Sequence, residues 1–458
     1  NMKVLNNIEK LFKSYIPNSF TIAVCLTLIT ILCAFIFTNS ESEIGYLLEI
    51  CSYWENGLWN NSLLVFAYQM ILILILGHIL VLSSPVSYLI DKLTVRIKSS
   101  SQAVVILSTV TLFAAFFNWG FGLILGAIFT RTIGEHCKKN NIKIYYPLLG
   151  AAGYVGLMVW HGGISGSAPI KASEKNHIKE LMTGVTDNSI INSLPSTIGL
   201  NETVFSTSNL VTYGFIFVII PLVFWVINKL VKPKDYELEI YDRDIIIKHT
   251  DLHLKIDESK TVAYIFGGFI LITLFFVHSD KILSLEISPN ILNLFMLGCA
   301  IIMHQNFISF LSALKNAISG AAGILIQFPL YFGIMGIMKQ SGLVLLMSEF
   351  FISISNQTTL PIYTLISAGI VNILVPSGGG QWAVQGPIII DAAINLGVPI
   401  QKVIMALAYG DQLTNMLQPF WALPLLAITG LKAKDILPFS LIAMVVGGLI
   451  FITSLLVI

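Results

Sequence analysis

Charge is scarce in this chain. Only 11% of its 458 residues are Asp, Glu, Lys or Arg, whereas 55% are hydrophobic. The formal net charge is +1, so the composition gives no indication of a nucleic-acid partner. The five cysteines are scattered without a CxxC spacing, which indicates neither a disulfide framework nor a zinc site. We expect no cofactor apart, at most, from a bound Na⁺.

Apolar sequence is abundant instead. The mean hydropathy is +0.81. Many apolar runs reach ~18–20 residues, the length that crosses a hydrocarbon core of about 30 Å. Because all backbone polar groups must be satisfied inside lipid, such runs form helices. The sequence therefore predicts an all-α polytopic membrane protein with membrane lipid around it.

The positions of Lys and Arg predict its orientation. Lys3, Lys10 and Lys13 place the N-terminus in the cytoplasm, since cytoplasmic loops carry an excess of basic residues. Most of the 26 Lys and Arg then fall on the cytoplasmic side. On this basis we expect spans at about 18–38, 62–86, 145–169, 209–230, 261–278, 288–304, 321–338, 401–428 and 438–457.

Two apolar stretches contain conspicuous breaks. The stretch 102–130 is interrupted at Asn118–Gly122 and has basic loops on both sides, which predicts a re-entrant hairpin from the cytoplasmic face. The stretch 359–396 contains PSGGGQW at 376–382 and predicts a second hairpin, which enters from outside. Non-helical backbone at membrane depth is tolerated only where protein or a water-filled cavity surrounds it. Both breaks are therefore candidate binding sites.

These features recur after 258 positions. Gln69 corresponds to Gln327, and Gly120 to Gly378. One extra crossing between the copies reverses the second, and inverted repeats of this kind are typical of secondary transporters. The predicted organisation is a first inverted repeat at 1–230 (hairpin 102–130, broken helix 145–169), a cytoplasmic linker at 231–260, an orientation-reversing helix at 261–278, and a second inverted repeat at 279–458 (hairpin 359–396, broken helix 401–428).

Four polar clusters should converge where the repeats meet, and none contains Lys or Arg. They are Asn118–Gly122, Trp160–Ser167, Ser377–Trp382, and Gly410–Asn415 with Gln418. Glycines permit close approach of a ligand to the backbone. The half-helix that begins near Gln381 would direct its amide N–H groups at an anion. Without a fixed cation, such a site suits one weak anion that arrives with a compensating cation.

Asp411 and His161 are the ionisable candidates in these clusters. Asp411 lies well inside its span, where a carboxylate is a functional candidate. It can hold Na⁺, take up a proton, or only cap a broken helix. His161 can be a hydrogen-bonded interior residue or a proton relay. The glycines and the tryptophans Trp160, Trp382 and Trp421 can likewise serve helix packing alone.

Four motifs, PSGGGQWAVQGP, NWGFG, WHGGISGSAP and AYGDQLTNMLQPFWALP, closely resemble those of the short-chain fatty acid transporters of the AtoE type, within the ion transporter superfamily. The resemblance covers almost the whole chain. It departs at two positions: His161 stands where relatives have glycine, and Asp411 where they have glutamate. The sodium motifs of dicarboxylate relatives are not plainly present, so both H⁺ and Na⁺ coupling stay open.

The resemblance implies an elevator-type scaffold plus transport domain, a homo-oligomer, and a multi-pass protein of the bacterial inner membrane that carries short-chain monocarboxylates by symport. Butyrate and acetoacetate are the implied substrates, with acetate and propionate. The residues expected to bind substrate are Asn118, Trp119, Gly120, Ser165, Ser167, Ser377, Gly378, Gly379, Gly380, Gln381, Trp382, Gln412, Asn415 and Gln418. The residues expected to couple the ion are Asp411, Thr414 and His161.

Two other functions fit the same residues. The first is a cation/proton antiporter that uses Asp411. The second is a membrane-embedded enzyme in which His161 and Asp411 act as acid and base, which requires both groups within reach of the substrate. They lie on different repeats, and no nucleophile motif accompanies them, so we expect a transporter and not an enzyme.

Overall fold

The structure is a computed structural model that describes residues 17–39, 45–183, 188–233, 256–283, 288–318 and 321–457, with a few isolated positions besides. Every regular element in these ranges is a helix. Most of the predicted linker 231–260 lies outside the described residues. Within them, six helices are long and apolar enough to cross a membrane, and a pair bent by 59° would make a seventh. The prediction of an all-helical, multi-pass membrane protein is confirmed.

The six long helices coincide with predicted apolar runs. They are α2 (Ser19–Phe37), α4 (Asn61–Leu82), α6 (Ser100–Phe117), α12 (Thr207–Leu230), α13 (Lys260–Leu283) and α22 (Ala433–Val457). These helices are apolar around most of their circumference, as expected of membrane spans. Large apolar side chains such as Phe276 are fully exposed on the isolated chain, where lipid would cover them.

The order of helices before α13 recurs after it. The first series is α3 (Tyr46–Leu58), α4, α5 (Ser84–Thr94), α6, α7 (Trp119–Lys139), α8 (Tyr146–Tyr154), η1 (Val155–Met158), α9 (Ser167–Ser173), the short α10 (His177–Leu181) and α11 (Asn188–Ser193), and α12. After α14 (Pro289–His304), the second series is α15 (Phe307–Ile318), α16 (Ala322–Gln340), α17 (Leu343–Ser353), α18 (Leu360–Leu374), α19 (Gly378–Leu396), α20 (Ile400–Thr414), η4 (Asn415–Leu417), α21 (Pro419–Thr429) and α22.

Some of these helices have no counterpart among the predicted spans. The helices α5, α15 and α17 are only 11 or 12 residues long. Such short helices are hard to tell from loops by hydropathy, because their apolar residues do not fill a spanning window. The recurrence of helix order agrees with a repeat. Its inverted orientation, the re-entrant hairpins and the domain boundaries stay predictions.

Helices α6 and α7 meet at a tip, as do α18 and α19, and the two tips are built in the same way. Between α6 and α7, Asn118 has an extended backbone, and its side-chain oxygen accepts a hydrogen bond from Phe121 N at 2.9 Å. Between α18 and α19, Ser377 is also extended, and its Oγ accepts from Gly380 N at 3.2 Å. A side-chain acceptor at this position satisfies one of the free amides with which a helix begins. The local sequence therefore starts a new helix at each tip.

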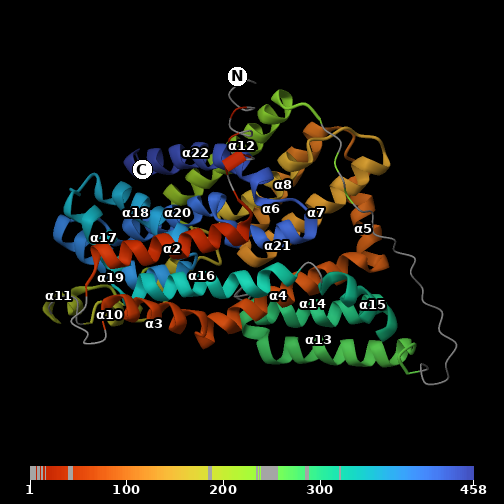
Figure 1. Ribbon diagram of the computed structural model, residues 1–458, viewed down its shortest axis with the longest axis horizontal. Coiled ribbons are helices and arrows are strands. Elements are labelled where there is room, and N and C mark those ends of the chain that lie inside the picture. Colours follow the sequence, from red (N-terminus) through yellow and green to blue (C-terminus); the bar gives the residue numbers. More distant parts are fainter. Residues whose placement is uncertain are drawn as a thin grey trace.

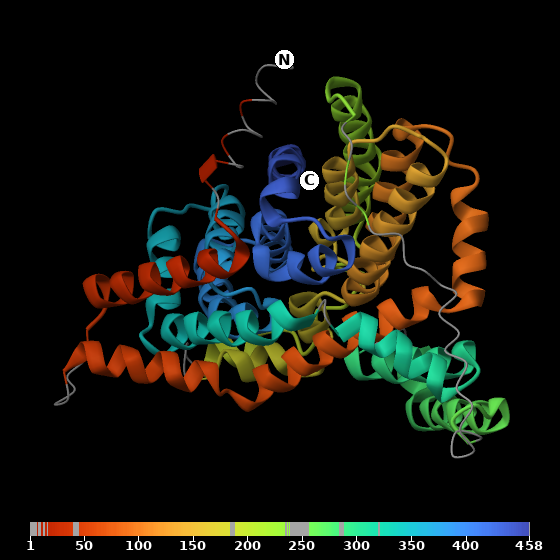
Figure 2. The ribbon, with the colours of Figure 1, turned by 45° about the vertical axis from the view of Figure 1, so that its right-hand side comes forward.

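The helices form two layers (Figure 1). In the lower layer, α16 packs against α2 and α3, while α14 packs against α4 and α13. Glycines permit the close approach of α3 and α16: a Cβ on Gly57 would lie 2.3 Å from Phe332 O. In the turned view, the later helices of each series, gold to green and blue, stand beside one another above this layer (Figure 2). The two tips (α6–α7 and α18–α19) and the two interrupted helices (α8–η1–α9 and α20–η4–α21) thus meet the lower layer at its centre.

Candidate substrate site

A cavity of about 210 Å³ lies where the two layers meet. The lower layer supplies its wall from α4 and α16, and the upper layer supplies both tips and both interrupted helices. The lining residues are Ser62, Leu63, Phe66, Trp119, Trp160, Ser167, Phe332, Met335, Pro376, Ser377, Gly378, Gly379, Phe420 and Trp421. None of these described residues carries a charge, as the sequence predicted for a site in this region.

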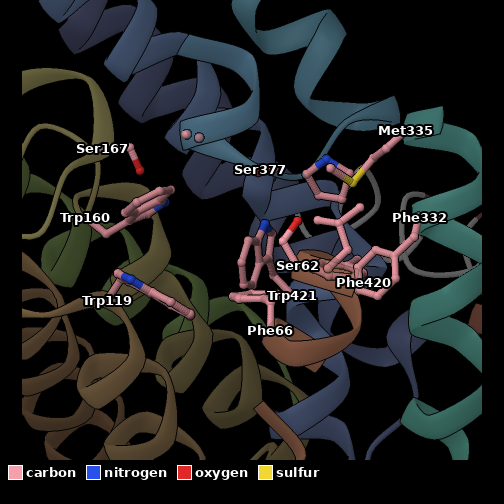
Figure 3. A pocket seen from close by; sticks show the side chains of 14 residues that line it. Ser62, Phe66, Trp119, Trp160, Ser167, Phe332, Met335, Ser377, Phe420 and Trp421 are labelled. Carbon is pink, nitrogen blue, oxygen red and sulfur yellow. The ribbon is translucent and has the colours of Figure 1, made fainter. Parts of the chain in front are cut away.

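Aromatic rings form one wall of this cavity (Figure 3). The ring of Trp119 lies 5.3 Å from that of Trp421 and 6.1 Å from that of Trp160, centre to centre. Phe66 of α4 closes the group, with its centroid 6.0 Å from Trp421. These spacings are typical of aromatic packing, and the rings present an apolar surface to whatever enters.

The first turn of α19 lines the cavity beside Trp160. Gly378 and Gly379 line the cavity, and among the described residues neither amide N–H has an acceptor. A Cβ on Gly379 would meet only Ser167, at 3.8 Å or more, so this position faces open space. A Cβ on Gly378 would lie 2.8 Å from both Trp160 and His161. Gly378 therefore permits close packing, whereas Gly379 leaves the cavity open.

The other tip contributes less than the sequence predicted. Trp119 lines the cavity, and its amide donates to Ser165 Oγ at 3.0 Å, so Ser165 holds the tip in place. Asn118 lies instead on a separate apolar cavity of about 450 Å³ that α13 and α14 help to line. Gly120 lines neither cavity; a Cβ on it would lie 3.5 Å from Asn118 Oδ1 and 3.8 Å from Leu292 of α14.

Three predicted binding residues are buried behind the cavity wall. Gln412 Oε1 accepts from the amides of His161 and Gly162, at 2.9 and 3.1 Å. Gln418 Nε2 donates to Ile373 O at 2.8 Å. Asn415 Oδ1 accepts from Asn372 Nδ2 at 2.7 Å. Each bond satisfies backbone or a neighbouring amide where a helix is interrupted, so these side chains stabilise the breaks.

Gly380, Gln381, Trp382 and Thr414 also lie outside the central cavity. Gln381 donates to Ala368 O at 2.7 Å and to Gln385 Oε1 at 2.6 Å. The indole N–H of Trp382 donates to His177 Nε2 at 3.0 Å. Thr414 Oγ1 donates to Gly369 O at 2.9 Å. Gly380 and Gln381 instead line a neighbouring cavity.

His161 and Asp411 are in contact, although 250 positions separate them. His161 Nδ1 bonds to Asp411 Oδ2. His161 Nε2 accepts from Ala168 N at 3.1 Å, which leaves the ring proton on Nδ1. Both side chains are fully buried, and the His161 ring stacks on Trp160 at 4.6 Å. The Asp411 side chain therefore does not cap a helix. It bonds to His161, whose ring stacks on the cavity-lining Trp160.

The sequence did not single out the residues of the lower layer. Ser62, Phe66, Phe332 and Met335 line the cavity, yet they sit in ordinary apolar runs. Nothing in composition or spacing distinguishes them from lipid-facing residues. Only the packing of α4 and α16 against the tips brings them to the site.

Comparison with known proteins places the chain in a family. Residues 2–458 match the family model described as short chain fatty acid transporter. A protein of Escherichia coli K12 is 34% identical over 451 residues, and one of Haemophilus influenzae Rd is 35% identical over 454. Each alignment covers 96% of both chains, and both relatives are designated candidate short-chain fatty acid transporters.

Two solved structures are similar at low identity. The Alcanivorax borkumensis YdaH transporter matches with a TM-score of 0.40 and 12% identity, over 95% of this chain and 98% of its own. The Neisseria gonorrhoeae protein MtrF, described with a class of antimetabolite efflux pumps, matches with 0.39 and 14%, over 98% and 97%. Likeness at this level carries no argument about this chain.

The apolar helices indicate a multi-pass membrane protein, and the family model and relatives make it a transporter. The chain belongs to the short-chain fatty acid transporter family. Family membership confirms the predicted resemblance and confirms that the protein is a transporter and not an enzyme. The contact between His161 and Asp411 is thus not the acid–base pair of a catalyst.

Proposed function

We propose that the protein moves short-chain monocarboxylates such as acetate, propionate, butyrate and acetoacetate across the bacterial inner membrane, coupled to H⁺ or Na⁺. Its central cavity of about 210 Å³ carries this proposal. Clefts that bind drug-sized ligands measure ~300–1,000 Å³, so this one suits a molecule of a few carbon atoms.

The cavity has polar groups that suit the carboxylate of such a molecule and apolar rings that suit its acyl chain. The free amides of Gly378 and Gly379, at the positive end of the α19 dipole, can receive a carboxylate. The rings of Trp119, Trp160 and Trp421 can cover the acyl chain. Ser167 and Ser377 supply hydroxyl groups between them. The remaining predicted binding residues act by holding these groups in position.

Coupling to a cation follows from the charge of the site. An anion in a cavity without a fixed cation needs a compensating positive charge. Asp411 is the candidate to receive it, because its Oδ1 is buried and has no hydrogen-bond partner among the described residues. A proton shared with His161 or a Na⁺ that Thr414 helps to hold would supply that charge.

The two layers suggest how the substrate crosses. In the proposed elevator mechanism, the tips and interrupted helices form the transport domain, and it moves against a scaffold that contains α4 and α16. The cavity lies between these parts, so movement would carry the substrate with Gly378 and Gly379. An inverted-repeat arrangement, a cytoplasmic N-terminus and a homo-oligomeric scaffold belong to the same proposal.

Uptake by purified protein in liposomes tests the function. Labelled butyrate should accumulate when an inward H⁺ or Na⁺ gradient is imposed, with the two gradients varied separately. Liposomes without protein serve as the control. Exchange of Na⁺ for H⁺ without butyrate uptake would instead favour the antiporter that uses Asp411.

A further inference from the structure

A second cavity of about 330 Å³ adjoins the central one. The two share Ser62, Leu63, Met335 and Ser377 as lining residues, so these four separate one chamber from the next. We call the second cavity the outer chamber. Exposed Asn56 and Asn60 stand at its rim, and buried Gln381 lies deeper, beside Ser377.

The outer chamber differs from the central cavity in charge. Lys339, in the last turn of α16, lines it with an exposed side chain. Within the described residues Lys339 forms no ion pair, and no carboxylate lines the chamber. The acidic residues of the adjacent helix α3, Glu49 and Glu55, are not among the lining residues. The ammonium group therefore has no opposing charge in the chamber.

We propose that the outer chamber is an access subsite for the carboxylate of the substrate, with Lys339 as the residue that attracts it. The inference rests on the proposed function. A positive charge at the mouth of a cleft raises the local concentration of anions. The neutral side-chain amides of Asn56 and Asn60 can then replace part of the carboxylate's water shell. From there the anion passes Ser377 to the amides of Gly378 and Gly379.

There is a physical reason for the lysine to lie in the outer chamber and not in the central cavity. A lysine inside the central cavity would bind the anion more tightly and slow its release. It would also supply the compensating positive charge itself, so that no coupled cation would be needed. A solvated lysine at the rim binds weakly, because water and salt screen its charge. It can thus speed capture without slowing release. The two chambers separate attraction from transport.

The test measures initial rates of labelled butyrate uptake in proteoliposomes over a range of butyrate and salt concentrations. We expect Lys339→Gln to raise KM about 3- to 10-fold with little change in kcat, as loss of one exposed charge implies. The KM of the unchanged protein should rise with ionic strength, and that of the variant should not. Lys339→Arg should keep the low KM. Lys175→Gln is the matched control, because Lys175 is exposed and lines neither chamber.

Two failures are distinguishable. If the unchanged protein takes up no short-chain acid, the proposed function is wrong. If it does, but Lys339→Gln behaves like Lys175→Gln, only the access subsite is wrong. Equal increases of KM for Lys339→Gln and Lys339→Arg would show that the charge is not what acts, and would also overturn the inference.

Discussion

Gly379 shows how a single side chain can be tested without disturbing the fold. A Cβ there meets no atom closer than 3.8 Å, so a larger residue fits but occupies the cavity. We expect Gly379→Val to abolish butyrate uptake while expression and size-exclusion behaviour stay normal. Gly268→Val on α13 is the control, since a Cβ on Gly268 meets nothing within 4 Å and Gly268 does not line the cavity. Normal uptake by Gly379→Val would leave the loop a purely structural role.

Asp411 is the residue on which coupling depends in our proposal. Replacing it with asparagine keeps the shape and removes the charge, so Asp411→Asn should alter the dependence of uptake on H⁺ or Na⁺ more than the preference among acids. The measurement is uptake of acetate and butyrate under each gradient. Asp391→Asn, a partly exposed carboxylate on α19, is the control. Unchanged ion dependence in Asp411→Asn would remove this residue from the ion site.

At the scale of helices, a buried ion pair within α7 is linked to the second interrupted helix by a hydrogen bond from its arginine. Arg131 of α7 bonds to Glu135 Oε1 at 3.0 Å and to Ile428 O at 2.9 Å, near the end of α21. Both charged side chains are more than nine-tenths buried. Composition and spacing do not distinguish this pair in the sequence. A buried arginine that contacts the carbonyl end of a helix stabilises that end.

Breaking this pair should weaken the packing of α7 against α21. Arg131→Met removes the ion-pair partner of a buried carboxylate, and breaking a buried pair in this way costs about 3–5 kcal/mol. We expect Arg131→Met to lower the melting temperature of the detergent-solubilised protein clearly. The double variant Arg131→Met/Glu135→Leu should recover much of the loss, because it leaves no unpaired charge. Equal melting of the single variant and the unchanged protein would contradict a stabilising role.

At the scale of the whole molecule, the proposed inverted repeat leads to a prediction about the side of the membrane on which each residue lies. Lys143 and Lys402 stand near the start of the two interrupted helices, α8 and α20. In a cysteine-free background, Lys143→Cys should react with an impermeant thiol reagent only from the cytoplasmic side, and Lys402→Cys only from outside. Labelling of intact cells and of inverted vesicles checks both. Reaction of both positions from one side would rule out the inverted arrangement.

Much of the fold follows from local sequence. Apolar runs long enough to cross a bilayer must form helices, so the positions of α2, α4, α12, α13 and α22 are set by hydropathy. The breaks were also visible, because the capping side chains Asn118 and Ser377 and their glycines interrupt apolar sequence. Short helices such as α5 and α17 were missed because they lack a spanning window of apolar residues.

By itself the sequence determined that this is a helical membrane protein with two interrupted regions that lack Lys and Arg. Only the tertiary structure decided which polar groups face the cavity. Gln412 and Gln418 hydrogen-bond to backbone groups near the helix breaks, and Asn415 to the side chain of Asn372, because a buried amide or carbonyl without a partner costs free energy. The contact of His161 with Asp411, and the lining by Phe66 and Phe332, depend on packing between distant segments, which no local pattern records.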